Sequence, residues 1–106
     1  MLYLLLLVNV QIADEAEFAR QFSKISAQAL EKPKFQFTTN ITYNRNTGTV
    51  EAPIACGLTI LGFPDHEDAQ EKCSEIYADF FSEKLDIAKE RVYIRFHSPS
   101  VPTTSR

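Results

Sequence analysis

Residues 2–10 read Leu-Tyr-Leu-Leu-Leu-Leu-Val-Asn-Val, and this stretch decides the fold. Residues 2–8 are all apolar, so they cannot alternate between a buried face and a solvent-exposed face. A strand built from them must therefore be covered on both sides. The run is far shorter than the roughly 20 apolar residues that cross a bilayer. It also lacks a preceding Lys or Arg and a nearby small-residue cleavage site, which argues against a signal peptide. We therefore expect a buried strand and no membrane anchor.

The length of 106 residues predicts a single domain, with residues 97–106 as an irregular tail. A hydrophobic fraction of 44% and a charged fraction of 24% are ordinary for a globular protein. The net charge is -3 and the Lys and Arg residues are scattered, so the basic patch of a nucleic-acid partner is missing. We expect a cytoplasmic protein, with export without a signal peptide as the alternative.

The two cysteines, Cys56 and Cys73, lie 17 positions apart. No His or further Cys stands at metal-ligand spacing beside them, so neither a zinc site nor a redox CxxC pair is indicated. We expect two reduced, buried thiols, no metal and no cofactor. Cysteines this sparse suit a reducing compartment, although the two could pair if the fold brought them together.

A helix is predicted over residues 15–30. Asp14 followed by Glu17 resembles a capping box, and Pro33 ends the segment. The residues expected on its buried stripe are Phe18, Ala19, Phe22, Ile25, Ser26, Ala29 and Leu30.

Two strands are predicted after this helix. Residues 35–43 alternate at period two, with aromatic and branched side chains on one face and Gln, Thr and Asn on the other. Residues 44–48 are expected to form a turn or an exposed loop, and residues 52–63 are expected to supply the next strand, centred on 54–61. Gly57 and Gly62 allow close backbone approach in this strand.

A second helix begins at Pro64-Asp65, with Asp68 at its third position, and ends near Lys84 or Leu85. Its buried stripe is expected to contain Ala69, Cys73, Ile76, Tyr77, Phe80 and Phe81. The sequence 65–68, Asp-His-Glu-Asp, resembles a metal cluster, but a solvated helix start explains it better. Residues 91–97 then alternate as a final strand.

The two halves repeat one another at a period of about 55 residues, each as strand, helix and strand. The fold class predicted is α+β: two β-α-β repeats forming a four-stranded mixed sheet with both helices on one face. The opposite face then exposes one apolar set of the first strand, which holds Tyr3, Leu5 and Leu7. At ~25 cal/mol per Å² such a surface is worth several kcal/mol when buried, so we expect a homo-oligomer.

Several short segments, in their order and spacing, resemble a known family. They are Asn9-Val10 after the apolar run, Lys32-Pro33, Cys56-Gly57-Leu58 with Leu61-Gly62, the sequence Phe-Phe-Ser-Glu-Lys-Leu at 80–85 with Asp86, and Arg91-Val92-Tyr93-Ile94. Together they are similar to the tautomerase superfamily, in the branch of macrophage migration inhibitory factor and D-dopachrome tautomerase. The ending Ile94-Arg95-Phe96 is closer to the dopachrome-tautomerase side. The resemblance implies a homotrimer whose sheets enclose a central space.

The resemblance also implies a catalytic mechanism. The family uses an N-terminal proline, exposed when the initiator Met is removed, as the general base of keto-enol tautomerisation. Here Leu2 stands at that position and has no secondary amine. The bulk of Leu2 favours retention of Met1, which would place the amine one residue further out.

The resemblance implies four substrate-binding residues: Lys32, Leu61, Tyr93 from a neighbouring subunit, and Arg95 in place of a pocket asparagine. Each has an ordinary structural alternative. Lys32 suits the negative end of a helix dipole, Tyr93 suits a subunit contact, and Arg95 suits an ion pair or an interface. His97 is a candidate for titration near neutral pH, although a lone surface His is usually structural. The family's C-terminal strand has no counterpart after Ser98, and only Cys56 remains of the cytokine's CxxC.

Three functional hypotheses follow. The first and favoured one is a catalytically inactive, cytokine-like member of the family, with a protein receptor as its partner. The second is a tautomerase of the phenylpyruvate or dopachrome type that uses the amine of Met1 or Leu2 as base, since an ordinary α-amino group has a pKa of ~7.7 to 8.0. The third is a structural or ligand-binding protein with no signalling role.

Overall fold

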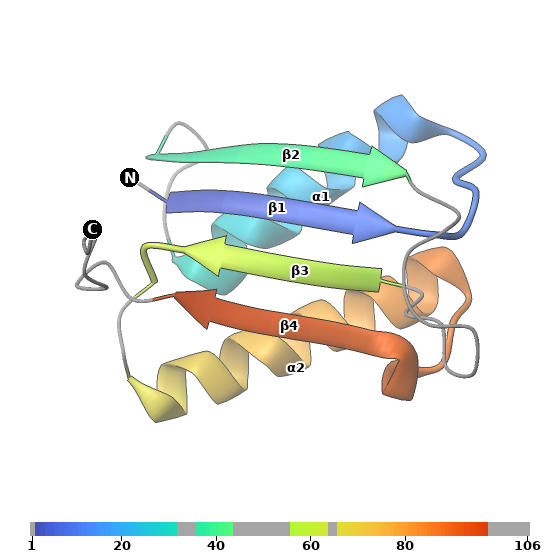
Figure 1. The fold of residues 1–106 in the computed structure, drawn as a ribbon. Coiled ribbons are helices and arrows are strands. Elements are labelled where there is room, and N and C mark those ends of the chain that lie inside the picture. Colours follow the sequence, from blue (N-terminus) through green and yellow to red (C-terminus); the bar gives the residue numbers. More distant parts are fainter. Residues whose placement is uncertain (1, 32–35, 44–55, 64–65, 98–106) are drawn as a thin grey trace, which may run out of the picture.

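The computed structural model describes residues 2–31, 36–43, 56–63 and 66–97. The elements follow in the order β1 (Leu2–Val8), α1 (Glu15–Leu30), β2 (Phe37–Tyr43), β3 (Cys56–Leu61), α2 (Glu67–Leu85), the short 3-10 helix η2 (Lys89–Arg91) and β4 (Val92–His97). The four strands form one sheet in the order β2-β1-β3-β4 (Figure 1). This confirms the predicted four-stranded α+β fold.

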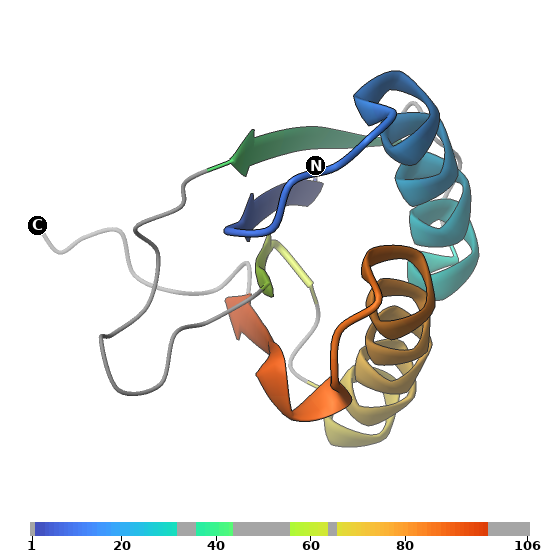
Figure 2. The same cartoon turned by 90° about the vertical axis from the view of Figure 1, so that its right-hand side faces the viewer.

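The sheet is mixed, as predicted. β1 pairs in parallel with β2, β3 pairs in parallel with β4, and the two central strands β1 and β3 run antiparallel. Each parallel pair is joined by its own helix, so the sheet consists of two β-α-β units that meet along an antiparallel seam. Both helices lie on the same side of the sheet, which is clear when the sheet is seen edge-on (Figure 2).

The first helix has the predicted bounds, and its start is capped as expected. The Asp14 carboxylate accepts a hydrogen bond of 3.1 Å from the backbone N–H of Glu17. The Glu17 carboxylate does not return the bond to Asp14, because it accepts from the side chains of Arg20 and Gln21 instead. The hydrogen bond from Arg20 holds the pKa of Glu17 below its ordinary value.

The second helix starts slightly later than predicted. Its N-cap is His66, whose Nδ1 accepts a hydrogen bond of 3.2 Å from the backbone N–H of Ala69. An unprotonated imidazole nitrogen replaces the usual Ser or Asp oxygen here. Asp68 is therefore the second helical residue and not the third. Residues 64–65, with which the helix was expected to begin, lie outside the described residues.

The predicted strands are longer than those observed. Asn9 and Val10 have left β1, and β3 ends at Leu61 because Gly62 turns the chain with a φ of 97°. Glycine is the residue that adopts this conformation without a steric cost. Residues 35 and 52–55, predicted to belong to β2 and β3, lie outside the described residues.

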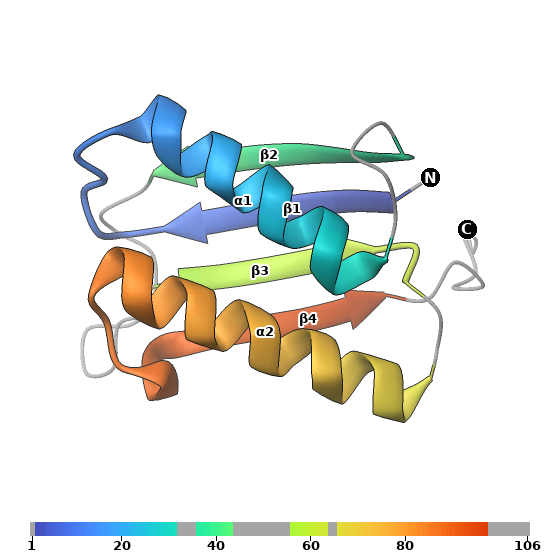
Figure 3. The same cartoon turned by 180° about the vertical axis from the view of Figure 1, so that it is seen from behind.

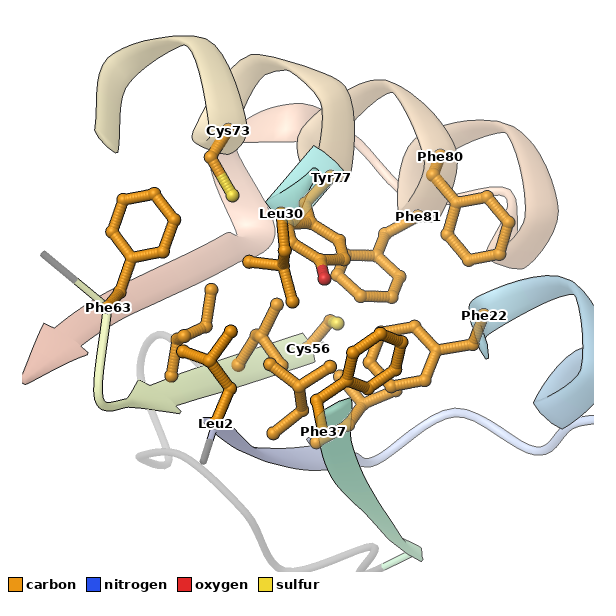
Figure 4. Packing of buried hydrophobic residues seen from close by; sticks show 14 of the residues in the cluster. Leu2, Phe22, Leu30, Phe37, Cys56, Phe63, Cys73, Tyr77, Phe80 and Phe81 are labelled. Carbon is orange, nitrogen blue, oxygen red and sulfur yellow. The ribbon is translucent and has the colours of Figure 1, made fainter. Parts of the chain in front are cut away.

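The core lies between the sheet and the two helices (Figure 4). From β1 it takes Leu2, Leu4, Leu6 and Val8; from α1, Phe18, Phe22, Ser26 and Leu30; and from α2, Cys73, Tyr77, Phe80 and Phe81. Five aromatic rings of the two helices pack against one another, with the Phe22 and Phe81 centroids 5.8 Å apart and the Phe80 and Phe81 centroids 5.4 Å apart. Ile25, Ala29 and Ile76, expected on the buried stripes, are only partly buried.

One buried hydrogen bond joins the two helices. The Tyr77 hydroxyl donates to Ser26 Oγ at 2.6 Å, and both side chains are fully buried. Burial raises the pKa of the Tyr77 phenol, so it stays a donor at any moderate pH. The contact connects residues 51 positions apart and sets how α1 and α2 face each other.

We expect Ser26→Ala to lower the free energy of unfolding by about 1–3 kcal/mol, because it leaves the buried Tyr77 hydroxyl without its acceptor. Tyr77→Phe should cost less, since the remaining Ser26 hydroxyl can turn to the carbonyl four residues earlier in its own helix. The double variant should lose less than the sum of the two single variants. Urea unfolding of the four proteins measures this, and strictly additive losses would contradict the coupling.

Candidate functional site

The family-type site is expected at the start of β1, and the sheet register defines what lies there. Tyr3 is paired with Leu61 of β3, and Leu61 is paired with His97 of β4. The first residues of β1 therefore lie at the same end of the sheet as the last residues of β3 and β4 (Figure 1). The Leu2 side chain points into the core and is buried there.

Gly62 fixes this end of the sheet. Its backbone N–H donates a hydrogen bond of 2.8 Å to the carbonyl of His97, just beyond the last paired residue, Leu61. The bond ties the end of β3 to the end of β4 and so positions Leu61. Leu61 is one of the predicted site residues. Its side chain is half-buried and lies on the sheet face that is free of helices.

Tyr93 and Arg95 lie on the same face as Leu61 but at other levels of the sheet. Tyr93 is 50% exposed and paired with Gly57, while Arg95 is exposed and paired with Thr59. At about 3.3 Å per residue, Tyr93 lies four residues, or ~13 Å, along the sheet from Leu61. Within one chain Leu61 and Tyr93 therefore do not form a common pocket, and Arg95 lies between them.

Two contacts set the position of β4. Ser82 Oγ donates to the carbonyl of Ile87 at 2.8 Å, and Lys89 Nζ lies 2.5 Å from a carboxylate oxygen of Asp79. Both connect α2 to the segment that leads into β4. Arg95, for which an ion pair was one interpretation, forms none with any residue that the structure describes.

The structure describes some of the remaining candidate residues from the sequence and leaves others outside the described range. Lys32 and Met1 lie outside the described residues, so their roles stay predictions. His97 was not assigned to the site, yet the register places it directly across from Leu61. The alternation over 91–97, which puts Tyr93, Arg95 and His97 on one face, was the available signal. Over the described residues no group of His, Cys, Asp and Glu could hold a metal ion, and His66 is a helix cap.

The family model of macrophage migration inhibitory factor matches residues 1–103. The chain belongs to the macrophage migration inhibitory factor family. The match includes both β-α-β units and every residue of the candidate site. It confirms the family resemblance of the sequence, in the tautomerase superfamily.

Solved structures of this family share the fold. The protein from Trichinella spiralis superposes with a TM-score of 0.77 at 18% identity, covering 98% of this chain and 95% of that one. A macrophage migration inhibitory factor-like protein from Entamoeba histolytica gives 0.73 at 19% identity, covering 92% and 87%. MIF2 from Leishmania major gives 0.72 at 16% identity, covering 99% and 94%.

Comparison with curated protein sequences gave no significant match. Neither α1 nor α2, nor any other helical segment among the described residues, is long and apolar enough to cross a membrane.

The two thiols of this family member are placed as predicted. Cys56, the first residue of β3, and Cys73, in α2, are both free and fully buried. Burial raises the pKa of each thiol from about 9 to about 12. A thiol with this pKa is protonated at neutral pH and is a poor nucleophile, which does not suit thiol-disulfide chemistry at Cys56.

We expect both cysteines to react slowly with a disulfide reagent such as DTNB at pH 8 and to react fast once the chain is unfolded in urea. Above about pH 9 the thiols ionise in the unfolded chain but stay protonated in the folded protein, because burial raises their pKa to about 12. The free energy of unfolding that the protonated thiols contribute is therefore fully present below about pH 9 and is lost as the pH rises toward 12. The free energy of unfolding should therefore already fall between pH 9 and 10.

The matched control for this measurement is the variant Cys56→Ala/Cys73→Ala, which should show a flatter stability profile between pH 9 and 10. Above that range the buried Tyr77 phenol adds its own dependence, since its pKa is also raised. A thiol in the folded protein that reacts at the unfolded rate would contradict the burial argument.

Proposed function

We propose that this protein is an oligomeric, trimer-forming member of the macrophage migration inhibitory factor family that acts by binding other proteins and lacks the family's proline base. The observation that carries the proposal is the outer face of the sheet, the one opposite the helices. β1 presents Tyr3, Leu5 and Leu7 there, and Tyr3 and Leu5 are 48% and 43% exposed. Figure 3 shows both helices on the other side.

The outer face carries an apolar stripe along β1. Leu5 has the polar Thr59 of β3 and Asn40 of β2 beside it, while Tyr3 lies next to Leu61. A fully buried Leu side chain contributes roughly 1.5–3 kcal/mol relative to an exposed one, so several such residues give a strong drive to association. Contiguous apolar patches on a sheet face are typical of subunit contacts. A second and third copy of this chain would cover the face.

The position of Tyr93 supports the same assembly. The family resemblance places a tyrosine from a neighbouring subunit at the substrate pocket, whereas the Tyr93 of one chain lies ~13 Å from its own Leu61. Its half-exposed ring is available to a neighbour. A trimer would therefore also complete each pocket, with Leu61 from one subunit and Tyr93 from the next.

The identity of residue 2 supports the loss of catalysis. The secondary amine of a proline is the base in this family, and positioned general bases contribute roughly 10²–10⁴-fold to a rate. Leu2 supplies no such amine, and its side chain is held in the core. The alternative is a tautomerase whose base is the primary amine of Met1 or Leu2, which would lie at the Leu61 end of the sheet.

We expect the purified chain to sediment as a trimer and Leu5→Lys to sediment as a monomer, because the variant places a charge at the centre of the outer face. The control is Gln28→Lys, which adds the same charge on an exposed position of α1 and should leave the trimer intact. Sedimentation velocity of the three proteins measures this.

Circular dichroism must show that Leu5→Lys keeps its secondary structure. A stable, well-folded monomer of the unmodified chain would contradict the assembly.

We expect no phenylpyruvate or dopachrome tautomerase activity above the uncatalysed rate for the unmodified chain. Leu2→Pro, after removal of Met1, should gain at least tenfold activity if the rest of the pocket is intact. Intact mass gives the N-terminus of each protein, and a thermal melt controls for the loss of Leu2 from the core.

Turnover by the unmodified chain that is lost on N-terminal acetylation and in Lys32→Ala would overturn the inactive interpretation. It would favour the primary-amine tautomerase.

A further inference from the structure

A hollow of about 230 Å³ lies on the helix side of the sheet, where β1 ends and α1 begins. Its walls are apolar and include the buried Val8 and Phe18 and the half-buried Ile41. Glu15 and Tyr43, both exposed, lie at its rim. Small-molecule sites typically combine such apolar walls with a few polar groups that orient the ligand.

This hollow is separate from the candidate site described above. Val8 lies six residues along β1 from Leu2, which is ~20 Å at strand spacing. In Figure 3 the end of β1 leads into the start of α1 and lies beside the end of β2, on the side covered by helices. Oligomer formation through the outer face would use the opposite side of the sheet, so the inference does not rest on the proposed function.

The rim carries a negative charge. Among the described residues that line the hollow, Glu15 is the charged one, and it makes no hydrogen bond or ion pair with another described residue. Asp14 next to it is held by the helix cap. Arg20, the basic residue two positions beyond Phe18, is paired with Glu17 and does not neutralise Glu15.

These features select the chemistry of a ligand. An anion would be repelled by Glu15, and a purely apolar ligand would gain no attraction from that carboxylate. A protonated amine would bind the Glu15 carboxylate and is also attracted to the face or hydroxyl of an aromatic residue such as Tyr43. Since a water molecule occupies about 30 Å³, the hollow holds the volume of roughly seven or eight waters, or one small ring with a short arm.

We propose that this hollow is a binding site for a small apolar ring that carries a protonated amine. The ring packs on Val8, Phe18 and Ile41, and the ammonium group binds at Glu15 and Tyr43. The site is formed by the ends of β1 and β2, the segment between β1 and α1, and the first two turns of α1, all of which belong to the first β-α-β unit.

The test is an NMR titration of the ¹⁵N-labelled full chain with 2-phenylethylamine, with 2-phenylethanol as the neutral isostere and phenylacetate as the anionic analogue. The amine should shift the amide signals of Ile12, Ile41 and Tyr43 and leave that of Leu61 unchanged. It should bind about two- to fivefold more tightly than the alcohol, the gain expected of an exposed ion pair, and phenylacetate should bind most weakly.

Two variants with matched controls locate the site. Ala19→Leu fills the hollow and should abolish binding, whereas Ala16→Leu makes the same change at an exposed position of α1 and should not. Glu15→Gln should bring the amine and the alcohol to equal affinity, whereas Glu83→Gln on α2 should leave the amine preferred. A thermal melt shows that each variant is folded.

Several results would overturn the proposal. They are the absence of binding by the amine, equal affinity of the unmodified chain for amine and alcohol, and binding to Ala19→Leu that matches the unmodified chain.

Discussion

The structure depends on the strand β1, whose two faces are both apolar. Alternation divides its residues into a set that packs under the helices and a set, Tyr3, Leu5 and Leu7, that the described chain does not cover. The inner set, Leu2, Leu4, Leu6 and Val8, supplies four of the sixteen buried hydrophobic residues that form the core of the described chain. Because β1 is also paired on both edges, by β2 and β3, it is the element that holds the two β-α-β units together and the one that creates a surface for further copies.

The arrangement also separates two kinds of surface. The predicted family-type site lies at the Leu61 end of the sheet and on its outer face. The hollow at Val8 belongs to the helix side and to the opposite end, within a single chain. A ligand in the hollow would therefore contact β1, α1, β2 and the segment between β1 and α1 of one chain. Leu61 and Tyr93, the predicted substrate-binding residues, lie ~13 Å apart within one chain.

Much of the fold could be predicted because its signals are local. Helical spacing of Phe18, Phe22, Ile25 and Ala29 with the Asp14 cap gave the bounds of α1, although Ile25 and Ala29 are only partly buried, and the alternation over 91–97 gave β4 and its outward residues. The start of α2 was less predictable because His66 caps it through a ring nitrogen, which sequence patterns seldom reveal. The site was only partly predictable. The register that brings His97 to Leu61, and the hollow between Glu15 and Tyr43, both depend on the packing of distant segments.

The antiparallel seam between β1 and β3 has a consequence for the engineering of this chain. Each helical crossover stays within its own half, so the backbone passes from one half to the other once, between Tyr43 and Cys56. New termini or inserted domains placed in that interval would keep every strand beside its present neighbours. The seam thus makes the molecule a fusion of two β-α-β modules, which are held together by strand pairing as well as by one covalent connection.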